Sequence, residues 1–163
     1  MNKLLLKNFT IIDPSENFKN VKDLLIVEGK IKEISESIDL SDIKIIEGNN
    51  NYLIPGLIDL HVHYRDPGET YKEDIKTGSY ASAKGGFTTV VMMSNTNPTI
   101  DNLNSLIEQK KLIDQYSKIR VLQTSSVTVG RKGKEIVDMD LLSQNGVVSF
   151  SDDGDVISDP NIL

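Results

Sequence analysis

Hydrophobic and polar positions in residues 1–52 form short apolar runs separated by polar turns. Runs of this length, rich in leucine, isoleucine and valine, predict β-strands rather than helices. The segment Glu28-Gly29-Lys30 predicts a tight hairpin, because glycine takes the positive φ that such a turn needs. We interpret the segment as a small β-domain with no chemistry of its own, with strands at 4–12, 24–27, 31–34 and 43–46.

The pattern changes after residue 52. Residues 53–60 form a nearly continuous apolar run that ends in the polar sequence His61-Val62-His63-Tyr64-Arg65. This is typical of a buried strand whose last residues emerge at a functional site. Thr70 and Glu73 have the spacing of a capping box and predict the start of a helix that runs to about residue 84. Gly85-Gly86 predicts its end, since glycine adopts the left-handed cap conformation without strain.

The strand and helix pattern then repeats along the rest of the chain. Asp101 is the predicted N-cap of a helix whose apolar positions have helical spacing, at Leu103, Leu106, Ile107 and Ile113. Alternating strands and helices predict a parallel sheet, with the functional site at the carboxyl ends of its strands. The other predicted elements are strands at 87–93, 119–124 and 147–150 and a helix at 134–144.

The length of this repeating region limits the fold. A complete (β/α)₈ barrel needs roughly 250 residues, whereas the whole chain has 163 residues. The strands predicted after residue 52 therefore form either a small open α/β sheet or the first part of a barrel. Because an open parallel sheet leaves an edge and a core face exposed, we expect the chain to be incomplete, with domains at 1–52 and 53–163.

Composition narrows the class of protein. The formal net charge of −6 argues against a nucleic-acid partner, because phosphate recognition requires a basic surface. The chain contains no cysteine, which excludes disulfides, thiolate-bound zinc, iron–sulfur clusters and thiol nucleophiles. Residues 1–10 hold a three-residue apolar run, too short for a signal peptide or a membrane span. We therefore expect no membrane partner and a cytoplasmic location.

The two histidines of the chain, His61 and His63, stand at the end of the apolar run. Side chains at i and i+2 of a strand point to the same face, and two imidazoles together suit a divalent metal such as Zn²⁺. A hydrogen-bonded or surface pair is the alternative interpretation. Asp152 and Asp153 follow the last predicted strand, where either carboxylate could bind a metal or act as a general base. An Asp-Gly turn is the alternative there.

Two further polar residues follow predicted strand ends. The guanidinium of Arg65 could bind a substrate carboxylate in a bidentate manner or form an ion pair with Asp66. Asn95 offers donors and an acceptor to a ligand, although the sequence Asn95-Thr96-Asn97-Pro98 also favours a turn. We interpret Gly130-Arg131-Lys132-Gly133 as a turn, because one glycine-rich basic loop is weak evidence for anion binding.

The run from Pro55 to Gly68 resembles the signature of the dihydroorotases, within the amidohydrolase superfamily. Four later segments are similar to the same family in the same order, at residues 71–75, 77–79, 85–90 and 95–98. The first strands are similar to the small β-domain that amidohydrolases build from both chain ends. The resemblance therefore implies an α/β fold, the N-terminal part of a (β/α)₈ TIM-type metal-dependent hydrolase barrel preceded by strands of a small β-sandwich domain.

The resemblance also implies roles for individual residues. It makes His61, His63 and Asp153 metal ligands, with Asp153 shared between two Zn²⁺ ions. It places His63, Arg65 and Asn95 against the substrate, the last two on its carboxylate. Further histidine ligands and the general base are expected beyond residue 163. Ser94 departs from the family, which usually has proline there, and we expect this to alter loop stiffness more than chemistry.

The implied reaction is the reversible, zinc-dependent cyclisation of N-carbamoyl-L-aspartate to L-dihydroorotate in de novo pyrimidine biosynthesis. Zinc would activate the water that attacks the ring amide in the hydrolytic direction. Other cyclic amidohydrolases, such as allantoinase and hydantoinase, are the first alternative. A non-catalytic dihydroorotase-like subunit that supports aspartate transcarbamoylase is the second. Partners beyond the small-molecule substrate are a second copy of the chain or aspartate transcarbamoylase, and we expect the 163-residue chain alone to be inactive.

Overall fold

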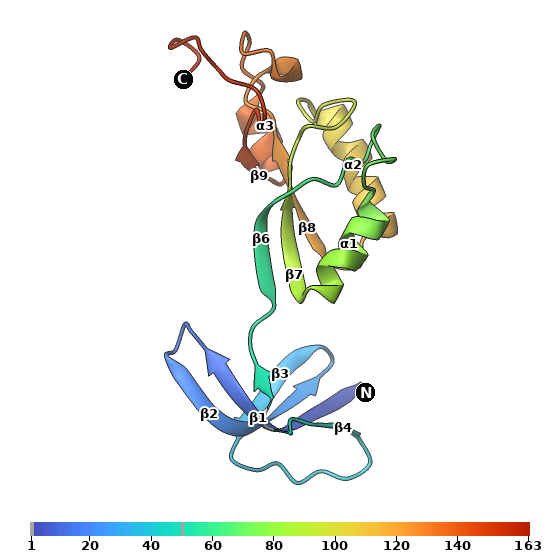
Figure 1. The fold of residues 1–163 in the computed structure, drawn as a ribbon, viewed down its shortest axis with the longest axis vertical. Helices are drawn as coiled ribbons and strands as arrows, with labels where there is room; N and C mark the ends of the chain where they lie inside the picture. The colour runs from blue at the N-terminus through green and yellow to red at the C-terminus, as the bar shows by residue number, and fades with distance from the viewer. Residues whose placement is uncertain (1, 50) are drawn as a thin grey trace. The chain divides into compact units, whose positions relative to one another are not determined.

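The computed structural model describes residues 2–49 and 51–163, which divide into two compact units, Met1–Pro55 and Gly56–Leu163 (Figure 1). The boundary lies after Pro55 rather than after residue 52 as predicted. The reason is a short strand, β5 (Tyr52–Leu53), which pairs with the first strand of the chain and so belongs to the first unit.

The first unit is one mixed β-sheet. Its other strands are β1 (Lys3–Asp13), β2 (Phe18–Val27), β3 (Lys30–Ser35) and β4 (Lys44–Glu47), in the order β3-β2-β1-β4. The first three strands are antiparallel neighbours, whereas β4 and β5 run parallel to β1. Glu28 and Gly29 have φ angles of 50° and 75°, which confirms the predicted hairpin. The described residues of this unit form a single sheet, so a β-sandwich stays a prediction.

The second unit alternates strands with helices, as the sequence predicted. It contains β6 (Leu57–Val62), α1 (Ile75–Lys84), β7 (Phe87–Met92), α2 (Leu103–Tyr116), β8 (Arg120–Ser125), α3 (Met139–Gln144) and β9 (Val147–Phe150). The four strands form a parallel sheet in sequence order, β6-β7-β8-β9 (Figure 1). Among the described residues, no helix has both the length and the hydrophobicity needed to cross a membrane.

Two helix starts differ from the prediction. The N-cap of α1 is Asp74, whose carboxylate accepts a hydrogen bond from the Thr77 N–H at 2.6 Å, while the predicted capping residue Thr70 lies in a turn. The N-cap of α2 is Asn102 rather than Asp101. The Asp101 carboxylate instead accepts the Gly130 N–H at 2.8 Å. A side chain with a distant partner can therefore look like a local cap in the sequence.

The third helix is shorter than predicted. It begins at Met139, with Asp138 as its N-cap, rather than at residue 134. The backbone before it makes non-helical hydrogen bonds, since the Val129 N–H donates to the Glu135 carbonyl and the Val137 N–H to the Val127 carbonyl, at 2.8 and 3.0 Å. Because of these bonds, residues 127–137 form a loop that folds back on itself after the carboxyl end of β8, and the predicted first turns of the helix do not form.

The second unit buries its apolar side chains between the sheet and its helices. One cluster contains Tyr64, Ile75, Val90 and Met92, and another contains Ile100, Leu106, Val137, Leu142 and Val147. A polar pair interrupts this layer. Gln109 on α2 is fully buried, donates to the Asp66 carbonyl at 3.2 Å and accepts from the buried Gln123 of β8 at 2.8 Å. The pair ties the loop after β6 to the helix layer.

Asp152 connects the loops that follow β8 and β9. Its side chain is buried, and its carboxylate accepts the backbone N–H groups of Val127 and Thr128 at 2.8 and 3.0 Å. The Thr128 hydroxyl donates to the same carboxylate. Three donors on one buried acceptor group fix the loop after β9 against the loop after β8.

Replacing Asp74 with alanine is expected to lower the free energy of unfolding by about 1 kcal/mol at pH 7, the usual cost of removing an N-cap. The backbone N–H and the hydroxyl of Thr77 donate to the Asp74 carboxylate and lower its pKa below the ordinary value of 3.8. A pKa that is lower in the folded chain stabilises the fold above the unfolded pKa, and this contribution is lost as the pH falls through the folded pKa.

Urea titrations at pH 7 and at stepwise lower pH measure this difference. The matched control is Asp74→Asn, which retains an acceptor for the Thr77 N–H and is expected to lose less stability than Asp74→Ala. Equal stability of Asp74→Ala and the unchanged protein at pH 7 would contradict the assignment of Asp74 as the cap.

Replacing Asp152 with alanine is expected to lower the free energy of unfolding by about 2–4 kcal/mol, because buried backbone N–H groups lose their acceptor. Thermal or chemical unfolding measures the loss. Asp114 is an exposed aspartate on α2, and Asp114→Ala is the control, with an expected change within about 0.5 kcal/mol. Similar losses in both variants would show that the buried carboxylate does not anchor the two loops.

Candidate metal and substrate site

The two histidines emerge side by side from the carboxyl end of β6. His61 lies in the strand and His63 directly follows it. Their Nε2 atoms are 3.2 Å apart and their rings meet edge to face, with centroids 5.0 Å apart. The backbone N–H of His61 also donates to the Asp59 carboxylate at 3.0 Å. The i, i+2 spacing thus places both imidazoles on one side of the strand, as the pattern predicted.

Asp153, in the loop after β9, completes a cluster with the two histidines. Its Oδ1 atom lies 3.4 Å from His61 Nε2, and its Oδ2 atom lies 3.4 Å from His63 Nε2. The three residues can each offer one ligand atom such that all lie within 4.8 Å of one another. Strands β6 and β9 are opposite edges of the four-stranded sheet, so residues far apart in sequence and in strand order converge here.

The spacing of these atoms fits a single metal ion. Ligands at about 2.1 Å from a tetrahedral Zn²⁺ ion lie roughly 3.4 Å from one another. The two Nε2 atoms are 3.2 Å apart, and each lies 3.4 Å from a different oxygen of Asp153. Two imidazoles and one carboxylate are also donors that Zn²⁺ and similar ions accept. Both the chemistry and the geometry of the donor set therefore suit a divalent metal.

Asn95 connects two of these side chains from the end of β7. Its amide oxygen lies 3.0 Å from His63 Nδ1, and its amide nitrogen donates to Asp153 Oδ2 at 2.9 Å. A proton on His63 Nδ1 satisfies the amide oxygen and leaves the Nε2 lone pair free for a metal ion. Asn95 thus orients a histidine and a carboxylate at the same time.

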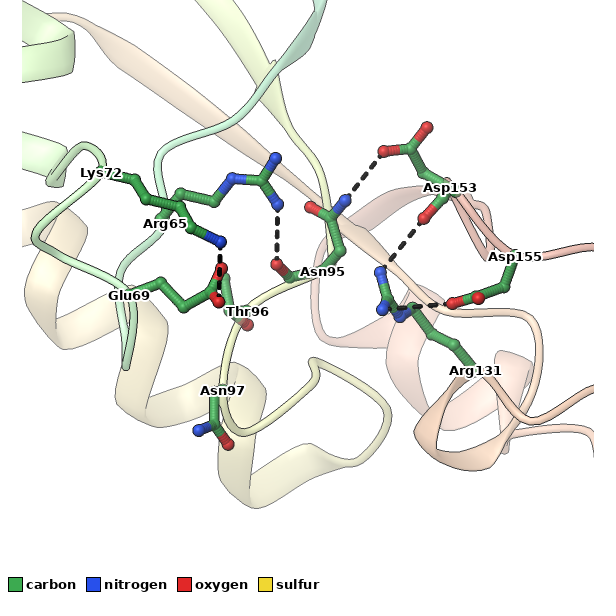
Figure 2. A pocket seen from close by; sticks show the side chains of 10 residues that line it. Arg65, Glu69, Lys72, Asn95, Thr96, Asn97, Arg131, Asp153 and Asp155 are labelled. Atoms are coloured by element: carbon green, nitrogen blue, oxygen red, sulfur yellow. Dashed lines mark hydrogen bonds and ion pairs between the residues drawn. The ribbon is translucent and has the colours of Figure 1, made fainter.

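A cavity of about 510 Å³ adjoins this cluster, because Asp153 is one of its lining residues. Figure 2 shows the side chains that line it. Arg65 reaches into it from the loop after β6, and its Nη1 atom donates to the Asn95 carbonyl at 3.2 Å. The ion pair between Arg65 and Asp66 that we considered from the sequence is absent among the described residues. The lining residues are mostly charged or amide-bearing: Arg65, Glu69, Lys72, Asn95, Thr96, Asn97, Arg131, Asp153, Gly154 and Asp155.

Charges in and beside the cavity are locally paired. Lys72 Nζ lies 2.9 Å from a Glu69 carboxylate oxygen, and the hydrogen bond from Lys72 lowers the pKa of Glu69. Burial raises the pKa of Asp66 in the same loop. Glu69 forms no ion pair with Arg65 among the described residues. The guanidinium therefore retains donors for an anionic ligand.

The structure separates the two aspartates that the sequence left open. Asp152 points into the protein and anchors the loop, whereas Asp153 points toward the histidines. Ser94 also has a role that sequence reasoning missed, since its hydroxyl donates to the Ser151 carbonyl at 3.0 Å and links the loops after β7 and β9. Arg131, which we assigned to a simple turn, lines the cavity. Its contacts cross between loops, and no local pattern reveals them.

Comparison with known proteins gives matches along the chain. The family model described as dihydro-orotase-like matches residues 50–161. The chain is 46% identical to the dihydroorotase of Aquifex aeolicus over 166 aligned positions, which cover 100% of this chain and 39% of that protein. It is 46% identical to the dihydroorotase of Clostridioides difficile, covering 98% and 38%. The chain therefore spans less than two fifths of the length of these curated relatives.

Solved structures share the fold. The L-hydantoinase (dihydropyrimidinase) from Arthrobacter aurescens superposes with a TM-score of 0.79 at 23% identity, covering 92% of this chain and 32% of that one. A crystal structure of a dihydroorotase gives a TM-score of 0.63 at 17% identity, covering 92% and 42%. At these identities the likeness concerns the fold alone, whereas the family model matches well over half of the sequence. On the strength of that match, the chain belongs to the dihydro-orotase-like family.

Proposed function

We propose that His61, His63 and Asp153 bind a metal ion in the working protein, and that this ion is Zn²⁺. The observation that carries the proposal is the convergence of two imidazole Nε2 atoms and a carboxylate at 3.2–3.4 Å. We further propose a second zinc ion, with Asp153 shared between the two. A carboxylate can bind one ion through each of its two oxygens, and the family resemblance implies a shared aspartate at this position. Ligands for a second ion must come from residues beyond this cluster.

We propose that the complete protein catalyses the reversible cyclisation of N-carbamoyl-L-aspartate to L-dihydroorotate, with release of water. Zinc supplies a water whose pKa is lowered toward 7 and a positive charge that polarises a carbonyl. The family membership and the charged cavity beside the metal cluster support this activity. We further propose that the general base lies beyond residue 163, as the family resemblance implies.

Arg65 and Asn95 are the proposed ligands of the substrate carboxylate. One donor of Arg65 is used by the Asn95 carbonyl, which leaves the rest of the guanidinium fork for a carboxylate. The Asn95 amide nitrogen carries two protons, and one of them is used by Asp153. Its second N–H is therefore able to donate to the same carboxylate. His63, which Asn95 orients, borders the reacting end of the substrate in this arrangement.

Several wider expectations belong to this proposal. The parallel sheet of the second unit is proposed to be the first part of a (β/α)₈ barrel, and the first unit part of a small β-sandwich domain. A cytoplasmic location stays a prediction. Association with a second copy or with aspartate transcarbamoylase also stays a prediction.

Removing one proposed ligand is expected to weaken metal binding strongly. His61→Ala and Asp153→Ala are each expected to lower the affinity for Zn²⁺ more than about 100-fold, beyond the loss typical of residues that only orient a ligand. Competition with a chromophoric chelator measures the affinity of the metal-depleted protein. Asp114→Ala removes an exposed carboxylate and is the control. Unchanged zinc affinity in both ligand variants would refute the proposed centre.

Turnover of three cyclic amides by the complete protein tests the proposed activity. L-Dihydroorotate is expected to be hydrolysed in preference to allantoin and hydantoin, and the isolated 163-residue chain is expected to turn over none of them. Arg65→Met is expected to raise KM for dihydroorotate about 10- to 100-fold, because a charge-assisted contact to the carboxylate is lost. Preference for allantoin or hydantoin would favour another cyclic amidohydrolase. Metal binding without turnover of any of the three would favour a non-catalytic subunit.

A further inference from the structure

The loop that carries Asp153 is anchored to the sheet and to a neighbouring loop at its start, and has fewer contacts after Asp153. At its start, the Ser151 N–H donates to the Ser125 carbonyl at 2.9 Å, and the Asp152 side chain is buried in the neighbouring loop. The next residues leave the sheet and reach the cavity. Gly154 has a φ of 87°, and a Cβ built on it meets no atom within 4 Å. The Cβ side of Gly154 therefore makes no packing contact, and the turn around it is closed by the Asp155 N–H, which donates to the Asp152 carbonyl at 2.8 Å.

Arg131 spans this turn from the neighbouring loop after β8. Its Nη1 atom donates to the Asp153 backbone carbonyl at 3.1 Å, and its Nη2 atom pairs with Asp155 Oδ2 at 3.1 Å. Figure 2 shows Arg131 with its contacts to Asp153 and Asp155, the residues before and after Gly154 in the sequence. One planar guanidinium thus holds the residues before and after the unpacked glycine, a geometry that the fixed fork of arginine provides and a lysine ammonium does not.

Arg131 is kept in this position at a structural cost. Its φ of 57° lies in the left-handed region, which is strained for a residue other than glycine. Its buried Nε atom has no hydrogen-bond partner among the described residues. The backbone is nevertheless held firmly, because the Arg131 N–H donates to the Thr128 carbonyl at 2.9 Å and Thr128 is itself bound to Asp152. Such costs are typical of residues retained for a function.

We propose that Arg131 is a positioning residue that fixes the Asp153 backbone so that the Asp153 carboxylate stays between His61 and His63. This inference rests on the proposed metal centre. Asp152 sets the start of the loop, Arg131 sets the carbonyl of the next residue, and Asn95 holds the carboxylate itself. Without Arg131 the Asp153 carbonyl loses its side-chain contact, and this part of the loop keeps the Ser151 hydroxyl on the Asp153 N–H, the turn bond from Asp155 to Asp152 and the Asn95 amide on the carboxylate. We expect the Asp153 carboxylate then to shift relative to the histidines.

The test is a Co²⁺ titration of the metal-depleted complete protein, followed by the visible absorption of the bound ion. Arg131→Met is expected to lower the Co²⁺ affinity about 10- to 100-fold, as for other residues that orient a metal ligand. It is also expected to change the shape of the absorption bands, because they report the ligand set. The matched control is Lys132→Met, which removes the same charge from the next, exposed residue and is expected to bind Co²⁺ within about twofold of the unchanged protein.

Each outcome bears on one claim. Failure of the unchanged protein to bind Co²⁺ would refute the metal centre itself. Binding that is equally tight in the unchanged protein and in Arg131→Met, with identical spectra, would refute the role of Arg131 and leave the metal centre standing. A lower unfolding temperature of the metal-free Arg131→Met protein with unaltered Co²⁺ affinity would also refute it, because that pattern indicates a structural role only.

A second variant keeps the proposal testable when Arg131→Met does not fold. Asp155 is half-exposed and its carboxylate touches the free end of the guanidinium. Asp155→Asn is expected to keep the fold and to lower the Co²⁺ affinity several-fold, less than Arg131→Met, because one arm of the bridge loses its charge. Unchanged affinity in Asp155→Asn would show that the bridge across Gly154 does not position Asp153.

Discussion

The site depends on one constraint, the parallel hydrogen-bonded register of strands β6 to β9. That register directs the carboxyl end of every strand to the same rim, so each following loop begins there. In a flat sheet the two edge strands would lie about 14 Å apart, yet side chains from both edges meet within 3.4 Å. The hydrogen bond from Ser94 to Ser151 also joins the loops after β7 and β9 across this rim.

The candidate site consists of groups that fix one another. Asp152 is buried and ties two loops together, Asn95 joins a histidine to a carboxylate, and Arg131 bridges Gly154. Asp152 accepts from the loop after β8, whereas Asn95 and Arg131 both donate to Asp153. The chemistry that we propose for the site therefore requires the loops after β6, β7, β8 and β9 to be in place together.

Periodicity predicted the parts of the structure that depend on local sequence. The alternation of strands and helices and the shared face of His61 and His63 follow from residue spacing, and the structure agrees with both. Helix starts were less predictable, because Asp101 uses its carboxylate on Gly130, far away in the sequence. The choice between Asp152 and Asp153 also depends on tertiary contacts. Residue types alone left it open, and only the family resemblance singled out Asp153 before the structure did.

The buried pair Gln109 and Gln123 limits which substitutions the chain can accept at these two positions during evolution. In an apolar layer, the Gln123 amide nitrogen donates to the Gln109 amide oxygen, and the Gln109 amide nitrogen donates to the Asp66 carbonyl. An apolar replacement of one glutamine leaves a buried polar group of the other without a hydrogen-bond partner, which costs about 1–3 kcal/mol. Replacing both together avoids part of that cost. The two positions are therefore expected to be inherited as a unit, so that related lineages keep both amides or exchange both.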